Sequence, residues 1–384
     1  MFFHAFSSSE AILKNIKIVD STLRDGEQTA GVIFTKQDKV KIAKELNDLG
    51  IYQIEAGIPA MLGEEFEAIS AIVKLGLKSK IMSWNRPVLS DIDMSLKSGV
   101  DSVGISCPIS PIHLHFKLGL EFDEALKLTD KAINYAKKHG LYVSTHMEDA
   151  GRAPRNFLVR FALMAKESGS DRLRICDTSS VMDPFKVHET VTYLSERVGI
   201  PLEVHMHNDF GMATANTLVG IASGSEFASV TVLGLGKMAG NASLEEVIAA
   251  LKFLWGVDLG VDLKGMASLS KYVSKKSGIE IPDFKPIIGK KLFSTESGIS
   301  LDARKMGEKI SAFSAQDLGM VEQLVIGKHS GPKAIKNKFE EFGIQLSDEQ
   351  INVILPKIKA KVLELSRTLF DKELMLIYKE TFNN

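Results

Sequence analysis

Residues 16–50 read IKIVDSTLRDGEQTAGVIFTKQDKVKIAKELNDLG and contain one complete strand–loop–helix unit. The unit opens with an apolar, β-branched run, Ile16–Asp20, that is typical of a buried strand. A helix is predicted over Lys36–Leu49, because its apolar residues recur three apart and a glycine follows the last turn. Thr35 and Asp38 form a capping-box pattern at its start. A polar segment therefore follows the end of the strand.

The same alternation continues along the chain. We expect eight strands, at Ile16–Asp20, Tyr52–Gly57, Lys80–Trp84, Ser102–Cys107, Leu141–Thr145, Leu173–Asp177, Leu202–His207 and Ala228–Gly234. Eight strands alternating with helices over about 250 residues match the (β/α)8 barrel in number and length. The alternative, a doubly wound open sheet, normally carries a GxGxxG turn after its first strand, and no such turn follows here. We therefore predict an α/β protein with a TIM barrel.

The alternation stops near Leu263, where prolines and glycines among lysine-rich stretches predict a loop. Further helices are predicted at Pro332–Phe342 and from Ser347 onward, where the sequence SDEQ forms a capping box. Pro356 is expected to kink or break the last of them. We therefore divide the chain into a barrel, residues 12–262, and a smaller, mainly helical C-terminal region, residues 263–384.

Composition excludes several classes of protein. Among 384 residues, 47 lysines and arginines nearly balance 48 aspartates and glutamates, so no net field attracts nucleic acid or an anionic membrane. Two cysteines are too few for a disulfide framework or a cysteine-rich zinc site. No apolar run is long enough to span a membrane, and the first residues do not resemble a signal peptide. We expect a soluble, cytoplasmic protein.

Polar residues collect where the predicted strands end, which is where active sites of TIM barrels lie. His205 and His207 are two apart on one strand, so both side chains point to the same face. With Asp25 after the first strand and Asn241 after the eighth, they predict a site for Mn, Mg, Co or Zn with positions left open for substrate. Two hydrogen-bonded histidines in a polar barrel mouth are the alternative.

Further side chains at the same end are candidates for catalysis. Arg24 is suited to stabilising negative charge on an oxygen, and a salt bridge at the barrel rim is the alternative. Glu148 is a candidate acid or base, or else a surface carboxylate. We expect the substrate to lie among Gln28, Glu55, Arg86, His146 and Thr178. Arg86 is suited to a second substrate carboxylate or to a rim ion pair, and Thr178 to a substrate carboxylate or to helix capping.

Three segments carry a resemblance to a known family. Residues 20–28 resemble the DxTLRDGEQ signature of the DRE-TIM metallolyases, the family of 2-isopropylmalate, citramalate and homocitrate synthases. Residues 205–217, HMHNDFGMATANT, and 234–246, GLGKMAGNASLEE, are similar to its second and third signatures. Residues 57–61, GIPAM, and the C-terminal tail look most like homocitrate synthases of the nitrogenase-cofactor type.

The resemblance implies a Claisen-type condensation of acetyl-CoA with a 2-oxo acid, 2-oxoglutarate being the best guess, in a homodimer. Asp25, His205, His207 and Asn241 fall on the family's metal-ligand positions, and Arg24 falls on its catalytic arginine. Glu148 and Thr178 fall on substrate-site positions. The implied class of enzyme is an acyltransferase.

Several residues depart from the family pattern. Ser300 stands where the family's SGIH motif has a histidine, and Thr295 stands where another histidine is common. Lys237 and Met238 replace a glutamate and an arginine of the third signature. Serine has no group that titrates near neutrality, so the proton-transfer groups or the second substrate are expected to differ. A carbon–carbon lyase or aldolase, and a non-catalytic binding homologue, are therefore kept as alternatives.

Overall fold

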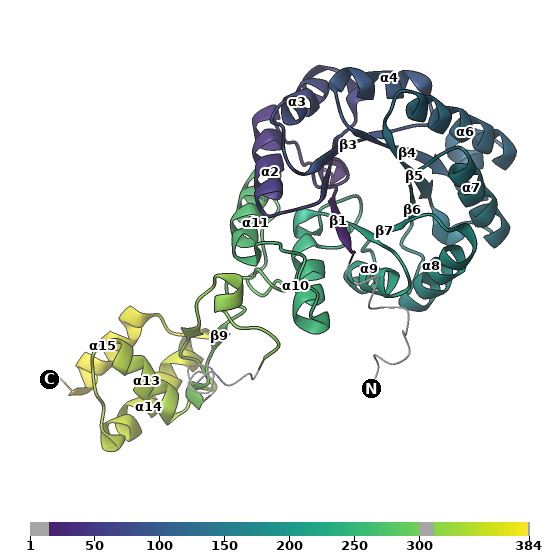
Figure 1. Ribbon diagram of the computed structural model, residues 1–384. Coiled ribbons are helices and arrows are strands. Elements are labelled where there is room, and N and C mark those ends of the chain that lie inside the picture. The colour runs from purple at the N-terminus through teal and green to yellow at the C-terminus, as the bar shows by residue number, and fades with distance from the viewer. Residues whose placement is uncertain (1–14, 300–310, 383–384) are drawn as a thin grey trace. The chain divides into compact units, whose positions relative to one another are not determined.

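The structure is a computed structural model that describes residues 15–299 and 311–382. Its first part is a closed barrel of eight parallel strands in sequence order, completed by the pairing of β8 with β1 (Figure 1). The strands are β1 Lys17–Asp20, β2 Gln53–Gly57, β3 Lys80–Asn85, β4 Ser102–Pro108, β5 Tyr142–Glu148, β6 Arg172–Asp177, β7 Leu202–Met206 and β8 Phe227–Val230. The predicted TIM barrel is confirmed.

Helices surround this barrel on its outer side (Figure 1). They are α2 Lys36–Asp48, α3 Gly63–Val73, α4 Leu89–Ser98, α6 Phe122–Lys138, α7 Arg155–Glu167, α8 Pro184–Val198, α9 Ala213–Ala222 and α10 Leu244–Trp255. Thr35 and Asp38 form the predicted capping box of α2, whose Ile42 and Leu46 are fully buried. Short helical turns follow most strands, at η2 Gly26–Gln28, η3 Pro59–Met61, α5 Pro111–His113, η4 Leu114–Leu118, η5 Ala150–Arg152 and η6 Val232–Gly234.

The end of β8 and the boundary between the two parts of the chain differ most from the prediction. β8 ends at Val230 rather than at Gly234, because Leu233 takes a positive φ of 62° and the chain turns. Helix α11, Leu263–Ser277, packs against α2 and α10 of the barrel, although the sequence placed it in the C-terminal region. Its Tyr272 donates a hydrogen bond to Asp38 of α2. The chain consequently divides between residues 281 and 282, and not at 262.

The second unit has its own hydrophobic core. Its described residues include a two-stranded sheet and several helical segments: β9 Ser294–Thr295, η7 Gln316–Leu318, β10 Gln323–Leu324, α13 Pro332–Glu341, α14 Asp348–Leu365 and α15 Asp371–Phe382. The core is built by apolar residues such as Phe339, Ile354 and Leu374. Helix α14 begins after the predicted Ser347 cap and continues through Pro356 as one element, so of the predicted kink or break the break does not occur.

Charged side chains fill part of the barrel interior. Arg172 and Arg174 project from β6 and are fully buried. Glu203 of β7 joins them, with Oε2 at 2.7 Å from Nε of Arg172 and Oε1 at 2.8 Å from Nε of Arg174. Arg172 also donates a hydrogen bond of 2.7 Å to Gln53 of β2. Since an unpaired buried charge costs several kcal/mol, these pairs hold β2, β6 and β7 in one arrangement. Among the described residues, no helix is long and apolar enough to cross a membrane.

Candidate metal centre and active site

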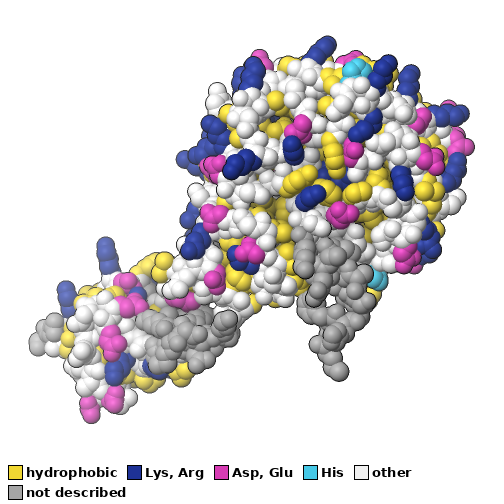
Figure 2. Space-filling model, viewed as in Figure 1, with side chains coloured by type: hydrophobic (Ala, Val, Ile, Leu, Met, Phe, Trp, Pro, Cys, Tyr) yellow, Lys and Arg dark blue, Asp and Glu magenta, His cyan; other side chains and the backbone are white. Residues whose placement is uncertain are grey.

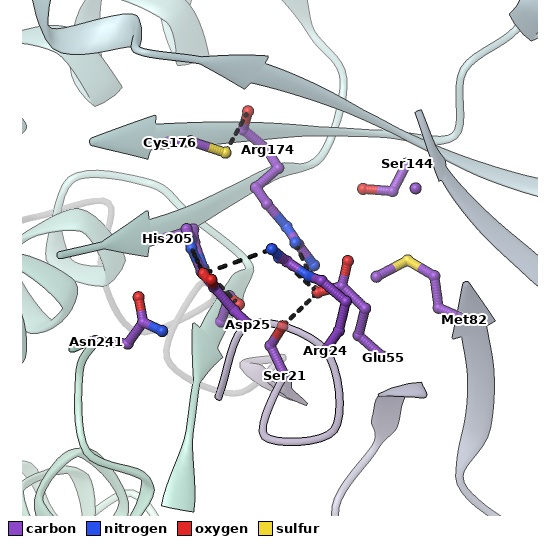
Figure 3. Close-up of polar contacts among 12 residues, drawn as sticks. Ser21, Arg24, Asp25, Glu55, Met82, Ser144, Arg174, Cys176, His205 and Asn241 are labelled. Carbon is purple, nitrogen blue, oxygen red and sulfur yellow. Dashed lines mark hydrogen bonds and ion pairs between the residues drawn. The ribbon is translucent and has the colours of Figure 1, made fainter. Parts of the chain in front are cut away.

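Asp25, His205 and His207 meet where the barrel strands end. Figure 3 shows Asp25 and His205 side by side. Asp25 follows β1, and the two histidines lie at the end of β7, where the alternation of strand side chains turns both inward. Nε2 of His205 lies 2.8 Å from Oδ2 of Asp25, and Nε2 of His207 lies 3.8 Å from the same oxygen. One ligand atom from each residue lies within 4.8 Å of the other two, so the three can bind one ion.

Two oxygen atoms at this centre make no hydrogen bond within the described chain. They are Oδ1 of Asp25 and Oδ1 of Asn241, and both are buried. Asn241 pairs with His207 in an isolated β-bridge, and its amide nitrogen donates to the carbonyl of Leu235 at 3.0 Å, which directs Oδ1 away from that carbonyl. Buried oxygens without partners are costly unless something binds them. The donor set of two imidazoles, a carboxylate and an amide oxygen therefore fits a divalent metal.

The histidines are neutral and one of them is held in position. Burial lowers the pKa of His205 to about 4 and also lowers the pKa of His207. Although burial alone would raise it, the pKa of Asp25 lies well below its usual value because of the charge of Arg24 and the hydrogen bond with His205. Oγ of Ser229, on β8, lies 2.9 Å from Nδ1 of His205 and so leaves Nε2 for the ion. Near neutral pH all three ligands are ready to bind a metal.

Arg24 lies beside Asp25 and is fixed in position by an ion pair with Glu55 (Figure 3). Its Nη1 is 3.5 Å from Oδ2 of Asp25, and its Nη2 is 3.0 Å from Oε2 of Glu55. The same Glu55 oxygen accepts hydrogen bonds from Ser21 at 2.5 Å and from Arg174 at 3.0 Å. Glu55 is fully buried and does not line the cavity. It therefore contacts Arg24 and not a substrate. Nε of Arg24 is buried and makes no hydrogen bond within the described chain.

A cavity of about 670 Å³ opens over the metal centre. Figure 2 shows hydrophobic and basic side chains gathered over the middle of the barrel on the face in view. The lining combines apolar residues with cations; it includes Gln28, Trp84, Arg86, Val88, Leu89, Lys117, Leu118, Leu120, Leu128, Lys131, His146, Glu148, Thr178 and Lys237. Four of the five residues that the sequence placed around a substrate therefore lie at the cavity, and Glu55 does not.

Two of these lining residues already have partners that limit their roles. Arg86 is largely exposed and forms a bidentate pair with Asp91 at the start of α4, with distances of 2.8 and 2.9 Å. Oγ1 of Thr178 accepts a hydrogen bond of 2.9 Å from the backbone N–H of Asp149. Arg86 thus forms the rim ion pair while its side chain still faces the cavity, and Thr178 anchors the chain after β5.

His146 and Glu148 point from β5 toward the cavity. The His146 ring lies against Gly104 of β4, where a Cβ atom would come within 2.4 Å of the ring, so glycine makes room for it. Burial holds the pKa of His146 well below its usual value, so the ring is neutral. Glu148 forms an ion pair with Lys117, and its Oε1 lies 3.4 Å from Nδ1 of His113.

Sequence reasoning missed the contribution of the segment after β4. His113 and Lys117 belong to α5 and η4, and both face Glu148. The available signal was the pair of polar residues that follows the fourth strand, Ser110 and His113. Ser300, where the family pattern has a histidine, lies outside the described residues, whereas Lys237 and Met238 lie in the loop after η6 and are exposed.

Comparison with known families matches both parts of the chain. Residues 15–273 match the HMGL-like family, and residues 287–364 match the homocitrate synthase post-HMGL domain-like family. A 2-isopropylmalate synthase 2 of Caldanaerobacter subterraneus subsp. tengcongensis is 49% identical over 96% of each chain. Homocitrate synthase 1 of a Nostoc species is 42% identical over 96% of this chain and 98% of the relative.

Solved structures agree on the fold. An HMG-CoA lyase of Bacillus subtilis aligns with a TM-score of 0.65 at 20% sequence identity. The alignment covers 70% of this chain and 96% of the lyase. At this identity the likeness supports the barrel architecture alone.

Proposed function

The chain belongs to the HMGL-like family of DRE-TIM metallolyases, and from this membership and the site geometry we propose that it condenses acetyl-CoA with a 2-oxo acid. The observation that carries the proposal is the cluster of Asp25, His205 and His207, which lines a cavity, with Asn241 bridged to His207 and two buried oxygens that make no hydrogen bond within the described chain. A divalent metal bound there would supply a Lewis acid for the oxo and carboxylate oxygens of the substrate.

Residues of this chain then stabilise the developing charge and transfer the proton. Arg24 faces the same region with an unpartnered Nε and stabilises negative charge that develops on the former oxo oxygen. Glu55 pairs with Arg24 and is itself paired with Arg174, so the guanidinium of Arg24 needs little reorganisation during the reaction. Glu148 lines the cavity and takes part in proton transfer from the acetyl methyl group. Manganese is the first metal to test, because the mixed oxygen and nitrogen ligands suit it.

The identity of the 2-oxo acid is decided by the cavity wall. Lys131 and Lys237 face the cavity and form no ion pair within the described chain, which favours a dicarboxylic acid such as 2-oxoglutarate. Leu118, Leu120 and Leu128 of the same wall favour an apolar side chain. The two relatives differ in the same way, one being named for isopropylmalate and the other for homocitrate. We place 2-oxoglutarate first and a branched-chain 2-oxo acid second.

A free-thiol assay with the manganese-loaded full chain, acetyl-CoA and a panel of 2-oxo acids tests the proposal. We expect thiol release with one oxo acid, and a fall of about 100-fold or more for Arg24→Ala and for His205→Ala. His139→Ala, an exposed histidine on the outer surface, is the matched control and should keep the wild-type rate. Absence of thiol release with every oxo acid would refute the synthase. Cleavage of a hydroxy acid would then identify a lyase, and substrate binding without turnover a binding homologue.

A further inference from the structure

His113 lies in the first turn after β4 and faces the end of β5. Ser110 accepts a hydrogen bond of 3.2 Å from the backbone N–H of His113 and donates one to the side chain of Asp149. Asp149 adopts a positive φ of 61°, a conformation that non-glycine residues rarely take, and Arg152 binds its carboxylate. The imidazole is therefore held in a rigid frame, with its side chain only 14% exposed.

The contacts of the ring determine which nitrogen carries its proton. Nη2 of Arg152 lies 2.9 Å from Nε2 of His113. A guanidinium can only donate, so Nε2 must accept, and the neutral ring carries its hydrogen on Nδ1. Nδ1 lies 3.4 Å from Oε1 of Glu148 and 3.7 Å from Oδ2 of Asp149, and it makes no hydrogen bond within the described chain. The N–H is therefore available to a carboxylate that lines the cavity.

We propose that His113 is a positioning residue for Glu148, whose carboxylate its Nδ1–H orients toward the substrate. This inference rests on the function proposed above, in which Glu148 takes part in proton transfer. The distance of 3.4 Å is longer than a hydrogen bond, as is common for catalytic contacts before substrate binds. Lys117, from the same segment after β4, contacts the same carboxylate oxygen. This segment thus provides two side chains that face Glu148, and one of them is an imidazole that does not depend on position 300.

The electrostatic surroundings keep the ring neutral. The charged groups that face it are Asp149, Lys117, Glu148 and Arg152. Burial is the largest influence and lowers the pKa of His113 below its ordinary value. A neutral ring with a fixed tautomer can act as donor to Glu148 throughout the neutral range.

Two substitutions of His113 distinguish the role of Nδ1 from the role of Nε2. In His113→Asn the amide can place an N–H near the position of Nδ1, whereas His113→Gln reaches the position of Nε2, which contacts Arg152. We expect His113→Ala and His113→Gln to lower kcat by about tenfold, with KM for both substrates little changed, and His113→Asn to recover most of the loss. Retention of kcat in the Gln variant but not in the Asn variant would assign His113 to the Arg152 frame and overturn the proposal. An unchanged kcat in the Ala variant would do the same.

A measurement without turnover covers the case in which variants fold poorly. In wild-type full chain labelled with 15N-histidine, the ring nitrogens of His113 should report a proton on Nδ1 near neutral pH. Glu148→Gln should shift the Nδ1 signal more than the Nε2 signal. A proton on Nε2, or no response to Glu148→Gln, would overturn the inference. If the wild type releases no thiol with any oxo acid, the proposed function fails, while the ring signals still decide whether His113 contacts Glu148.

Discussion

Two buried carboxylates in the same barrel, Glu203 and Asp25, differ in how many of their oxygens lie against a basic side chain. Each oxygen of Glu203 lies within 2.8 Å of an arginine nitrogen, so arginines face both oxygens, although Oε2 makes no hydrogen bond within the described chain. Asp25 has one oxygen against Arg24 and His205, and the other makes no hydrogen bond within the described chain. A buried carboxylate whose two oxygens both face arginines is structural, whereas a carboxylate that lines a cavity with one oxygen unpaired can bind a ligand.

The partners differ in the same way. Arg172 and Arg174 are fully buried, face Glu203 and do not line the cavity beside Asp25. Arg24 is also buried, but it lines the cavity and keeps an unpartnered Nε. Burial of charge is therefore common to both regions, and so are nitrogen atoms without a hydrogen bond within the described chain, such as Nη1 of Arg172 and Nη2 of Arg174. The cavity distinguishes the site from the scaffold.

The largest effect is expected from breaking the matched carboxylate. Glu203→Gln keeps the shape of the side chain but leaves Arg172 and Arg174 without their counter-charge, which should lower the free energy of unfolding by about 3–5 kcal/mol. Urea unfolding of the metal-free protein measures this. Glu196→Gln, at an exposed position of α8, is the control and should change stability by about 0.5 kcal/mol or less. Equal stability of both variants would show that the interior pairs contribute little.

Removing the carboxylate of Asp25 should affect metal binding more than folding. Asp25→Ala deletes an oxygen ligand and should weaken Mn²⁺ binding by more than about 100-fold, because even outer-shell changes commonly cost 10–100-fold. Isothermal titration calorimetry measures the affinity, and His139→Ala serves as the control. Unchanged Mn²⁺ affinity in the Asp25 variant would contradict the assignment of this centre as a metal site.

The smallest expected effect concerns the orientation of one ligand. Ser229→Ala removes the hydroxyl beside Nδ1 of His205 without touching the ion, and should weaken Mn²⁺ binding by about tenfold. The same titration gives the affinity, with Ser195→Ala of the outer helix α8 as the matched serine control. A loss as large as that of Asp25→Ala would mean that Ser229 itself is a ligand.

The sequence by itself predicted the barrel and the chemistry of its open end. Eight apolar runs alternating with helical segments have few alternative arrangements, and the two-residue period of a strand places His205 and His207 on one face. Because all strand ends of a parallel barrel meet at one rim, Asp25 could be added to the histidines from its position after the first strand alone.

Only the tertiary structure decided which polar residues contact one another. Glu55 was expected beside a substrate, yet closure of the barrel places it between Arg24 and Arg174. His113 became a candidate only when the chain after β4 was seen against Glu148 of β5. Helix α11 packs on the barrel through buried residues such as Met266 and Val273, and its Tyr272 donates a hydrogen bond to Asp38, which is far away in sequence. Local periodicity determines which face a side chain takes, but pairing between distant segments depends on how the whole chain closes, and no local pattern contains that information.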